Sequence, residues 1–165
     1  MSLVATSTAR ADDDRTNRIV FGYGQYGFYK STDESRHSFH LEARMAEIPV
    51  WKFHPWVGVE YNEAGSNAAY AGLETDMDIN ENWVVTLQAG AGYFNDGKHN
   101  RNRDYYPPEG FKIRTQAEIG YKFENGYQLS FGASHSSNAG TKFPNPGGNM
   151  LSINAHVPIG NISGD

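Results

Sequence analysis

The sequence predicts an all-β protein, an eight-stranded antiparallel up-and-down transmembrane β-barrel. From Arg18 onward, apolar and polar residues alternate with a period of two, and helical spacing is hard to find. Aromatic residues make up 13% of the chain and glycine 18 of its 165 residues, which is typical of many short β-strands. The predicted strands are joined by short turns that alternate with longer loops, the pattern of an outer-membrane barrel.

The alternation defines the strands in order along the chain. It appears in SFHLEARMAE (38–47), again in WVVTLQAGAGY (83–93), and most clearly in FKIRTQAEIGYKFE (111–124), where the odd positions form an apolar face and the even positions a polar one. The same criterion applied throughout predicts eight strands, at residues 18–29, 37–48, 56–62, 68–78, 83–94, 111–123, 127–134 and 150–158.

We divide the chain into a flexible N-terminal leader at 1–17, one barrel domain at 18–159 and a C-terminal tail at 160–165. The leader has no basic start followed by an apolar run, so we do not expect it to be a signal peptide. The segment EAGSNAA at 63–69 is predicted to be a turn.

The alternation alone allows two kinds of barrel. In a lipid-embedded barrel the apolar face points outward, whereas in a soluble ligand-binding barrel such as a lipocalin the arrangement is reversed. Glycines crowd the polar face, as expected where side chains converge inside a narrow barrel. The polar face also carries both charge signs, so buried ion pairs are expected among Glu42, Arg44, Glu60, Glu74, Arg114 and Glu118.

Aromatic residues near the strand ends also favour the lipid-embedded barrel. Interfacial girdles of Trp and Tyr lie at this level in membrane proteins. The residues assigned to the girdles are Trp51, Trp56, Tyr61, Trp83, Tyr93, Tyr121, Phe123 and Tyr127.

The composition excludes several other classes of protein. A net charge of -5 argues against a nucleic-acid binder. The absence of cysteine excludes disulfides, thiolate metal sites and thiol catalysis. No run approaches the roughly 18 apolar residues of a membrane helix. The histidines show no ligand spacing for a metal, and we expect no cofactor.

The stretch FGASHSSNAGTKFPNPGGNM (131–150) contains the candidate site. The odd parity of the seventh strand continues through His135 and Ser137, and Asn149 shares the parity of the apolar face of the eighth strand. If the two strands pair, all three side chains project from the lipid-facing wall, where polar groups are costly and indicate function. If the seventh strand ends before His135, the same residues form a loop rich in turn-formers.

The motif ASHSSNAG (133–140), followed by PNPG (144–147), resembles the signature of the PagL family of outer-membrane lipid A 3-O-deacylases. The resemblance covers the strand region and is strongest at 111–159. It implies a serine-dependent carboxylic ester hydrolase, with His135 as general base, Ser137 as nucleophile, and Asn138 and Gly140 in the oxyanion hole. It further implies hydrolysis of the acyl ester at position 3 of lipid A, in the outer membrane of a Gram-negative bacterium, with lipopolysaccharide and outer-membrane lipids as partners and no cofactor.

One position departs from the family pattern. The family usually has a Glu fourteen residues after the His, and this chain has Asn149 there. An Asn can orient an imidazole, but it cannot offset the charge of the imidazolium. Glu109 is a candidate substitute acid, because it precedes the sixth strand and shares the odd parity. The missing Glu leaves a catalytically weak relative, which binds lipopolysaccharide or is structural, as an alternative function. The alternation leaves a soluble ligand-binding barrel as another.

Basic residues in the predicted outer loops form a second group of candidates. They either belong to solvated loops or contact lipid A phosphates. These residues are Lys98, Arg101, Arg103 and Lys142. The sequence leaves a homodimer open.

Overall fold

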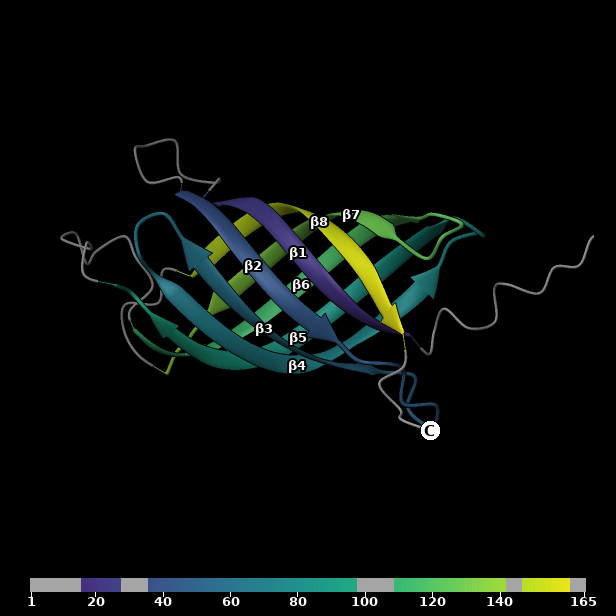
Figure 1. Cartoon of the computed structure of the whole chain (residues 1–165). Helices are drawn as coiled ribbons and strands as arrows, with labels where there is room; N and C mark the ends of the chain where they lie inside the picture. Colours follow the sequence, from purple (N-terminus) through teal and green to yellow (C-terminus); the bar gives the residue numbers. More distant parts are fainter. Residues whose placement is uncertain (1–15, 28–35, 98–108, 142–146, 161–165) are drawn as a thin grey trace, which may run out of the picture.

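The computed structural model describes residues 16–27, 36–97, 109–141 and 147–160, which form a closed barrel of eight strands (Figure 1). The strands are β1 (Asn17–Tyr26), β2 (Arg36–Arg44), β3 (His54–Asn62), β4 (Asn67–Asp78), β5 (Trp83–Asn95), β6 (Gly110–Lys122), β7 (Gln128–Ser137) and β8 (Gly148–Gly160). Each strand pairs antiparallel with its neighbours in the chain, and β1 pairs with β8 to close the barrel. The predicted fold class is confirmed.

The seventh strand is longer than predicted, and this difference matters for the site. The prediction ended it at 134, but β7 continues to Ser137. Ser137 pairs with Ile113 on β6, and His135 pairs with Asn149 on β8. The neighbouring strands β6 and β8 therefore continue their hydrogen-bonded ladders with β7 as far as Ser137 and Ser136, which are residues that favour turns. The prediction was wrong because backbone pairing overrides the turn preference of Ser136 and Ser137.

The short connections lie at the end of the barrel where β1 begins and β8 ends (Figure 1). They join β2 to β3, β4 to β5, and β6 to β7. At the opposite end, the predicted turn after β3 is present, and it is only four residues long, so not every connection there is a long loop. The side chain of Asn62 closes this turn by accepting the N–H groups of Ala64 and Ser66.

Exposure shows which face of the sheet is the outside of the barrel. Large apolar side chains cover the outer wall: Phe39 is 56% exposed, Phe131 51% and Ile153 57%. The buried residues are mainly polar or charged and lie on the opposite face. This arrangement is that of a lipid-embedded barrel and excludes the reverse, soluble arrangement. Among the described residues, no helix has the length and apolarity needed to cross a membrane.

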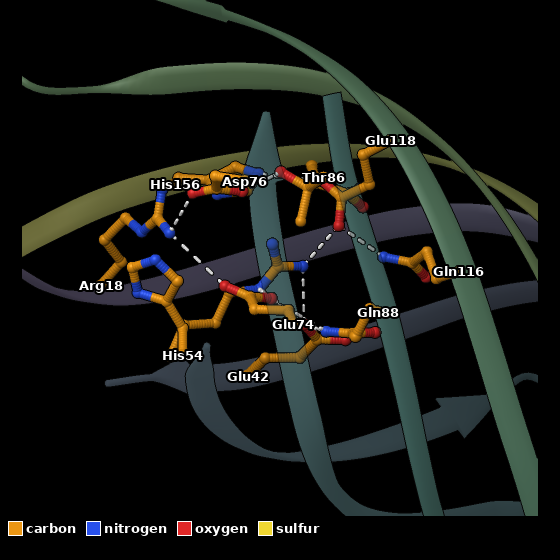
Figure 2. A network of polar contacts seen from close by, with 12 residues as sticks. Arg18, Glu42, His54, Glu74, Asp76, Thr86, Gln88, Gln116, Glu118 and His156 are labelled. Carbon is orange, nitrogen blue, oxygen red and sulfur yellow. Dashed lines mark hydrogen bonds and ion pairs between the residues drawn. The ribbon is translucent and has the colours of Figure 1, made fainter. Parts of the chain in front are cut away.

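Ion pairs fill the barrel interior (Figure 2). The Arg44 guanidinium lies among three carboxylates, with Nη2 2.8 Å from Glu42 Oε2, Nε 3.1 Å from Glu74 Oε2, and Nη2 2.5 Å from Glu118 Oε1. Arg18 also bridges Glu74 and Asp76. Asp76 is half-buried and the other five groups are buried, so their charges are compensated mainly by one another rather than by water.

The expected interior pairs are confirmed for five of the six predicted residues. Besides the three carboxylates around Arg44, Arg114 Nη1 lies 3.0 Å from Glu42 Oε1. Glu60 is the exception, because no ion pair among the described residues includes it. The sequence analysis did not select Arg18 or Asp76, although both have the same inward parity on their strands.

One girdle assignment was wrong. Trp56 is only 1% exposed and lies inside the barrel. It pairs with Gly72 across β3 and β4, and a Cβ added at Gly90 would lie 2.5 Å from its ring atom Cζ2. The Arg114 guanidinium lies 5.5 Å from the centre of the ring. The glycines therefore leave the interior space that the indole fills, and strand parity, not closeness to a strand end, decides its direction.

Replacement of Arg44 tests the interior network. Arg44→Met should lower the free energy of unfolding by about 3–5 kcal/mol, because it leaves buried carboxylates without their cation. Asp78→Asn is the control. It removes a pair with Lys122 in which the Asp78 side chain is 59% exposed, so it should cost about 0–1 kcal/mol. Urea titration in micelles measures both variants, and equal losses would contradict the role given to Arg44.

Candidate active site

The end of β7 and the start of β8 bring three predicted site residues together on the outer wall. His135 lies directly opposite Asn149 in the ladder, and Ser137 is two residues beyond His135 on the same face. His135 is exposed, while Ser137 and Asn149 are half-buried. The N–H of Gly27, just after β1, donates to the carbonyl of Asn149 at 2.8 Å. The end of β1 is thus hydrogen-bonded to the site as well.

A short hydrogen bond fixes the imidazole. His135 Nδ1 lies 2.7 Å from Asn149 Oδ1. An amide oxygen only accepts, so Nδ1 carries the proton and donates it to Asn149. In the neutral ring with this tautomer, the other nitrogen, Nε2, has a lone pair and can accept a proton. This is the tautomer that a general base requires.

Ser137 is placed by the turn that follows it. Its Oγ accepts the N–H of Ala139 at 3.5 Å. Within the part of the chain that the structure describes, no hydrogen bond joins Ser137 to His135. Catalytic hydrogen bonds are often long in the free enzyme and tighten when substrate binds, so the arrangement is compatible with a nucleophile and base pair.

Asn138 and Gly140 form a tight turn. Asn138 is 2% exposed, and its Oδ1 accepts the N–H of Gly140 at 2.9 Å. Its carbonyl accepts the N–H of Thr141 at 3.0 Å. Ala139 and Gly140 have φ angles of 52° and 76°, in the left-handed region. In this arrangement the Gly140 N–H is engaged by Asn138, and the N–H directed at Ser137 Oγ belongs to Ala139, a donor that the sequence analysis did not select.

The candidate substitute acid lies away from the imidazole. The Tyr93 hydroxyl donates to Glu109 Oε1 at 2.8 Å. Tyr93 is on β5, which lies on the opposite side of β6 from β7. Glu109 therefore bonds toward β5 and not toward His135. The four basic loop candidates, Lys98, Arg101, Arg103 and Lys142, lie outside the described residues.

A hollow of about 470 Å³ lies on the outer wall beside His135 and Asn149. Small and apolar side chains from β5, β6 and β7 line it, among them Leu87, Ala117 and Ala133. The sequence analysis missed this hollow. Its residues lie on four strands, β5 to β8, so only the register between the strands shows that they are neighbours. Among the described residues, no three His, Asp or Glu side chains cluster so that they could hold a metal ion.

The comparisons with known proteins identify a matching family and a shared fold. A family model described as lipid A 3-O-deacylase (PagL) matches residues 23–158. The crystal structure of the outer membrane enzyme PagL is 20% identical, with a TM-score of 0.61 over 86% of this chain and 99% of that one. No curated protein sequence matches significantly.

Two further solved structures share the fold. A de novo designed transmembrane β-barrel is 14% identical, with a TM-score of 0.61 over 88% of this chain and 96% of the design. Neisserial surface protein A is 11% identical, with a TM-score of 0.59 over 86% of this chain and 94% of that one. At such identities the structural matches support the fold alone, while the family model covers most of the chain.

Proposed function

The chain belongs to the PagL family of lipid A 3-O-deacylases, and we propose that it hydrolyses its ester with Ser137 as nucleophile and His135 as general base. The observation that carries this proposal is the 2.7 Å hydrogen bond between His135 and Asn149 on the outer wall. It supports a proton on Nδ1, which leaves Nε2 as the ring nitrogen that accepts a proton, two residues from a hydroxyl on the same face.

The reaction proceeds through an acyl-enzyme. Nε2 of His135 takes the Ser137 proton while Oγ attacks the ester carbon, and the imidazolium then protonates the departing sugar 3-oxygen. Water, deprotonated by the same nitrogen, releases the fatty acid and restores Ser137. The carbonyl oxygen carries negative charge in each tetrahedral intermediate, and a well-placed N–H donor is typically worth about 3–4 kcal/mol there.

The donors for this oxyanion come from the turn after Ser137. The N–H of Ala139 is directed at Oγ, so a small movement brings it to the carbonyl oxygen of a bound ester. Asn138 and Gly140 contribute in the bound state if their mutual hydrogen bond, 2.9 Å in this structure, opens toward substrate.

The outward direction of the site suits a membrane-embedded ester. Lipid A lies in the outer leaflet, so its acyl ester meets the outer wall of a barrel that spans the outer membrane of a Gram-negative bacterium. The hollow beside His135 gives the acyl chain an apolar surface next to the reacting carbon. Lipopolysaccharide is thus the partner that this wall fits, and no cofactor takes part in the steps above.

Asn149 favours a second candidate function, that of a catalytically weak relative of the deacylases. It sets the imidazole tautomer, but it has no negative charge to stabilise the imidazolium. A slow enzyme and a lipopolysaccharide-binding relative share this geometry and differ only in turnover.

The nucleophile and base are tested by substitution. Ser137→Ala and His135→Ala should each abolish most release of 3-hydroxy fatty acid from lipopolysaccharide, because each removes a reacting atom. Ser136→Ala is the matched control, since Ser136 is adjacent in sequence but points inward and is 8% exposed. Mass spectrometry of the released fatty acid measures all three variants, and undiminished activity in Ser137→Ala would rule out this nucleophile.

The Asn149 position is tested by restoring the carboxylate. Asn149→Glu should raise kcat by about tenfold or more, a part of the roughly 10⁴-fold that loss of the acid costs at a Ser-His-Asp site, since Asn149 already sets the tautomer. Glu109→Gln should leave kcat unchanged, because that carboxylate bonds to Tyr93. A loss of activity in Glu109→Gln, with no gain in Asn149→Glu, would identify Glu109 as the acid instead.

A further inference from the structure

The imidazole of His135 lies over the chain segment that enters β8. Its Nδ1 is bonded to Asn149, and its adjacent Cε1–Nε2 edge lies beside Gly147, two residues earlier. A Cβ built on Gly147 would lie 2.8 Å from His135 Cε1 and 3.4 Å from Nε2. Real Cβ atoms essentially never come as close as 2.8 Å, so the ring occupies space that exists only because residue 147 has no side chain.

The ladder places this space beside the nucleophile. Ser136 pairs with Gly148 in the last pair between β7 and β8, and Ser137 and Gly147 are the residues that adjoin this pair on the two chains. The Cε1–Nε2 edge of the imidazole thus lies beside Gly147, next to the pair that Ser137 also adjoins. The contact between the His135 ring and Gly147 therefore also determines the direction of Nε2.

The adjacent glycine serves a different purpose. A Cβ on Gly148 would collide with the hydroxyl of Tyr26, which lies on the inner side of the barrel. Gly147 and Gly148 thus leave room for two different side chains on the two faces of the wall. Only Gly147 lies against a side chain of the outer face. Among the described residues, a single side-chain hydrogen bond holds His135, so a Cβ at residue 147 would displace this ring rather than the backbone.

We propose that Gly147 is a positioning residue of the deacylase site, which seats the His135 imidazole so that Nε2 faces Ser137. This inference rests on the proposed function. A methyl group at 147 forces the ring to rotate, which breaks the bond to Asn149 or turns Nε2 away from Ser137. A displacement of about 1 Å in a catalytic group can cost about 10²-fold in rate.

The variants must separate this steric effect from backbone strain. Gly147 has a φ of 61°, in the left-handed region, where most residues are strained and Asn is tolerated best. Gly147→Ala adds both the Cβ and the strain, whereas Gly147→Asn adds the Cβ with less strain. Gly160→Ala is the matched control, because Gly160 has a φ of 70° and a Cβ there meets nothing within 4 Å.

Deacylation kinetics and histidine NMR provide the test. Gly147→Ala and Gly147→Asn should both lower kcat by about 10- to 100-fold with KM unchanged, while Gly160→Ala keeps the parent kcat. In ¹⁵N-histidine-labelled protein, the ring-nitrogen shifts of His135, assigned with His135→Ala, should change in both Gly147 variants and stay in place in Gly160→Ala.

Three results would overturn the proposal. They are a parent-like kcat in Gly147→Ala, recovery of kcat in Gly147→Asn, and a reduced kcat with unmoved His135 shifts. The failure of the proposed function is distinguishable, because Ser137→Ala would then keep its activity whatever residue 147 does.

Discussion

The pairing of charged side chains inside the barrel is the constraint on which the remaining structure depends. Arg44 contacts Glu42, Glu74 and Glu118 at 2.5–3.1 Å in a space closed to solvent. Unpaired, each buried charge would cost several kcal/mol. Because these charges neutralise one another, polar side chains can occupy the inward positions of every strand, and the outer wall can be almost wholly apolar.

This constraint also determines where chemistry can take place. Side chains alternate between the two faces with a period of exactly two, so a one-residue slip would move every charge to the outer wall. The register that holds Glu118 inside also directs His135 and Ser137 outward, since β6 and β7 are paired along their length. The interior serves as the scaffold, and the proposed hydrolysis takes place on the face where an acyl ester of the outer leaflet lies.

The features that follow from parity could be predicted from the sequence, and the features that follow from contacts between strands could not. The eight strands, the inward Glu42–Arg44 pair and the outward direction of His135 all follow from alternation. The inward direction of Trp56 also follows from parity, but the space that its ring fills depends on a glycine of a neighbouring strand, and the position of the His135 ring depends on Gly147. The bond of Glu109 to Tyr93 likewise required the fold, because parity alone does not choose between the two neighbours of β6.

The most direct test of the central claim is covalent trapping of the nucleophile by a long-chain fluorophosphonate on the protein in lipid vesicles, followed by mapping of the modified peptide. The outward register predicts one adduct, on Ser137, formed more slowly when His135 is replaced by Ala. An adduct on the inward Ser136, or continued deacylation with no adduct on either serine, would contradict an outer-wall serine hydrolase.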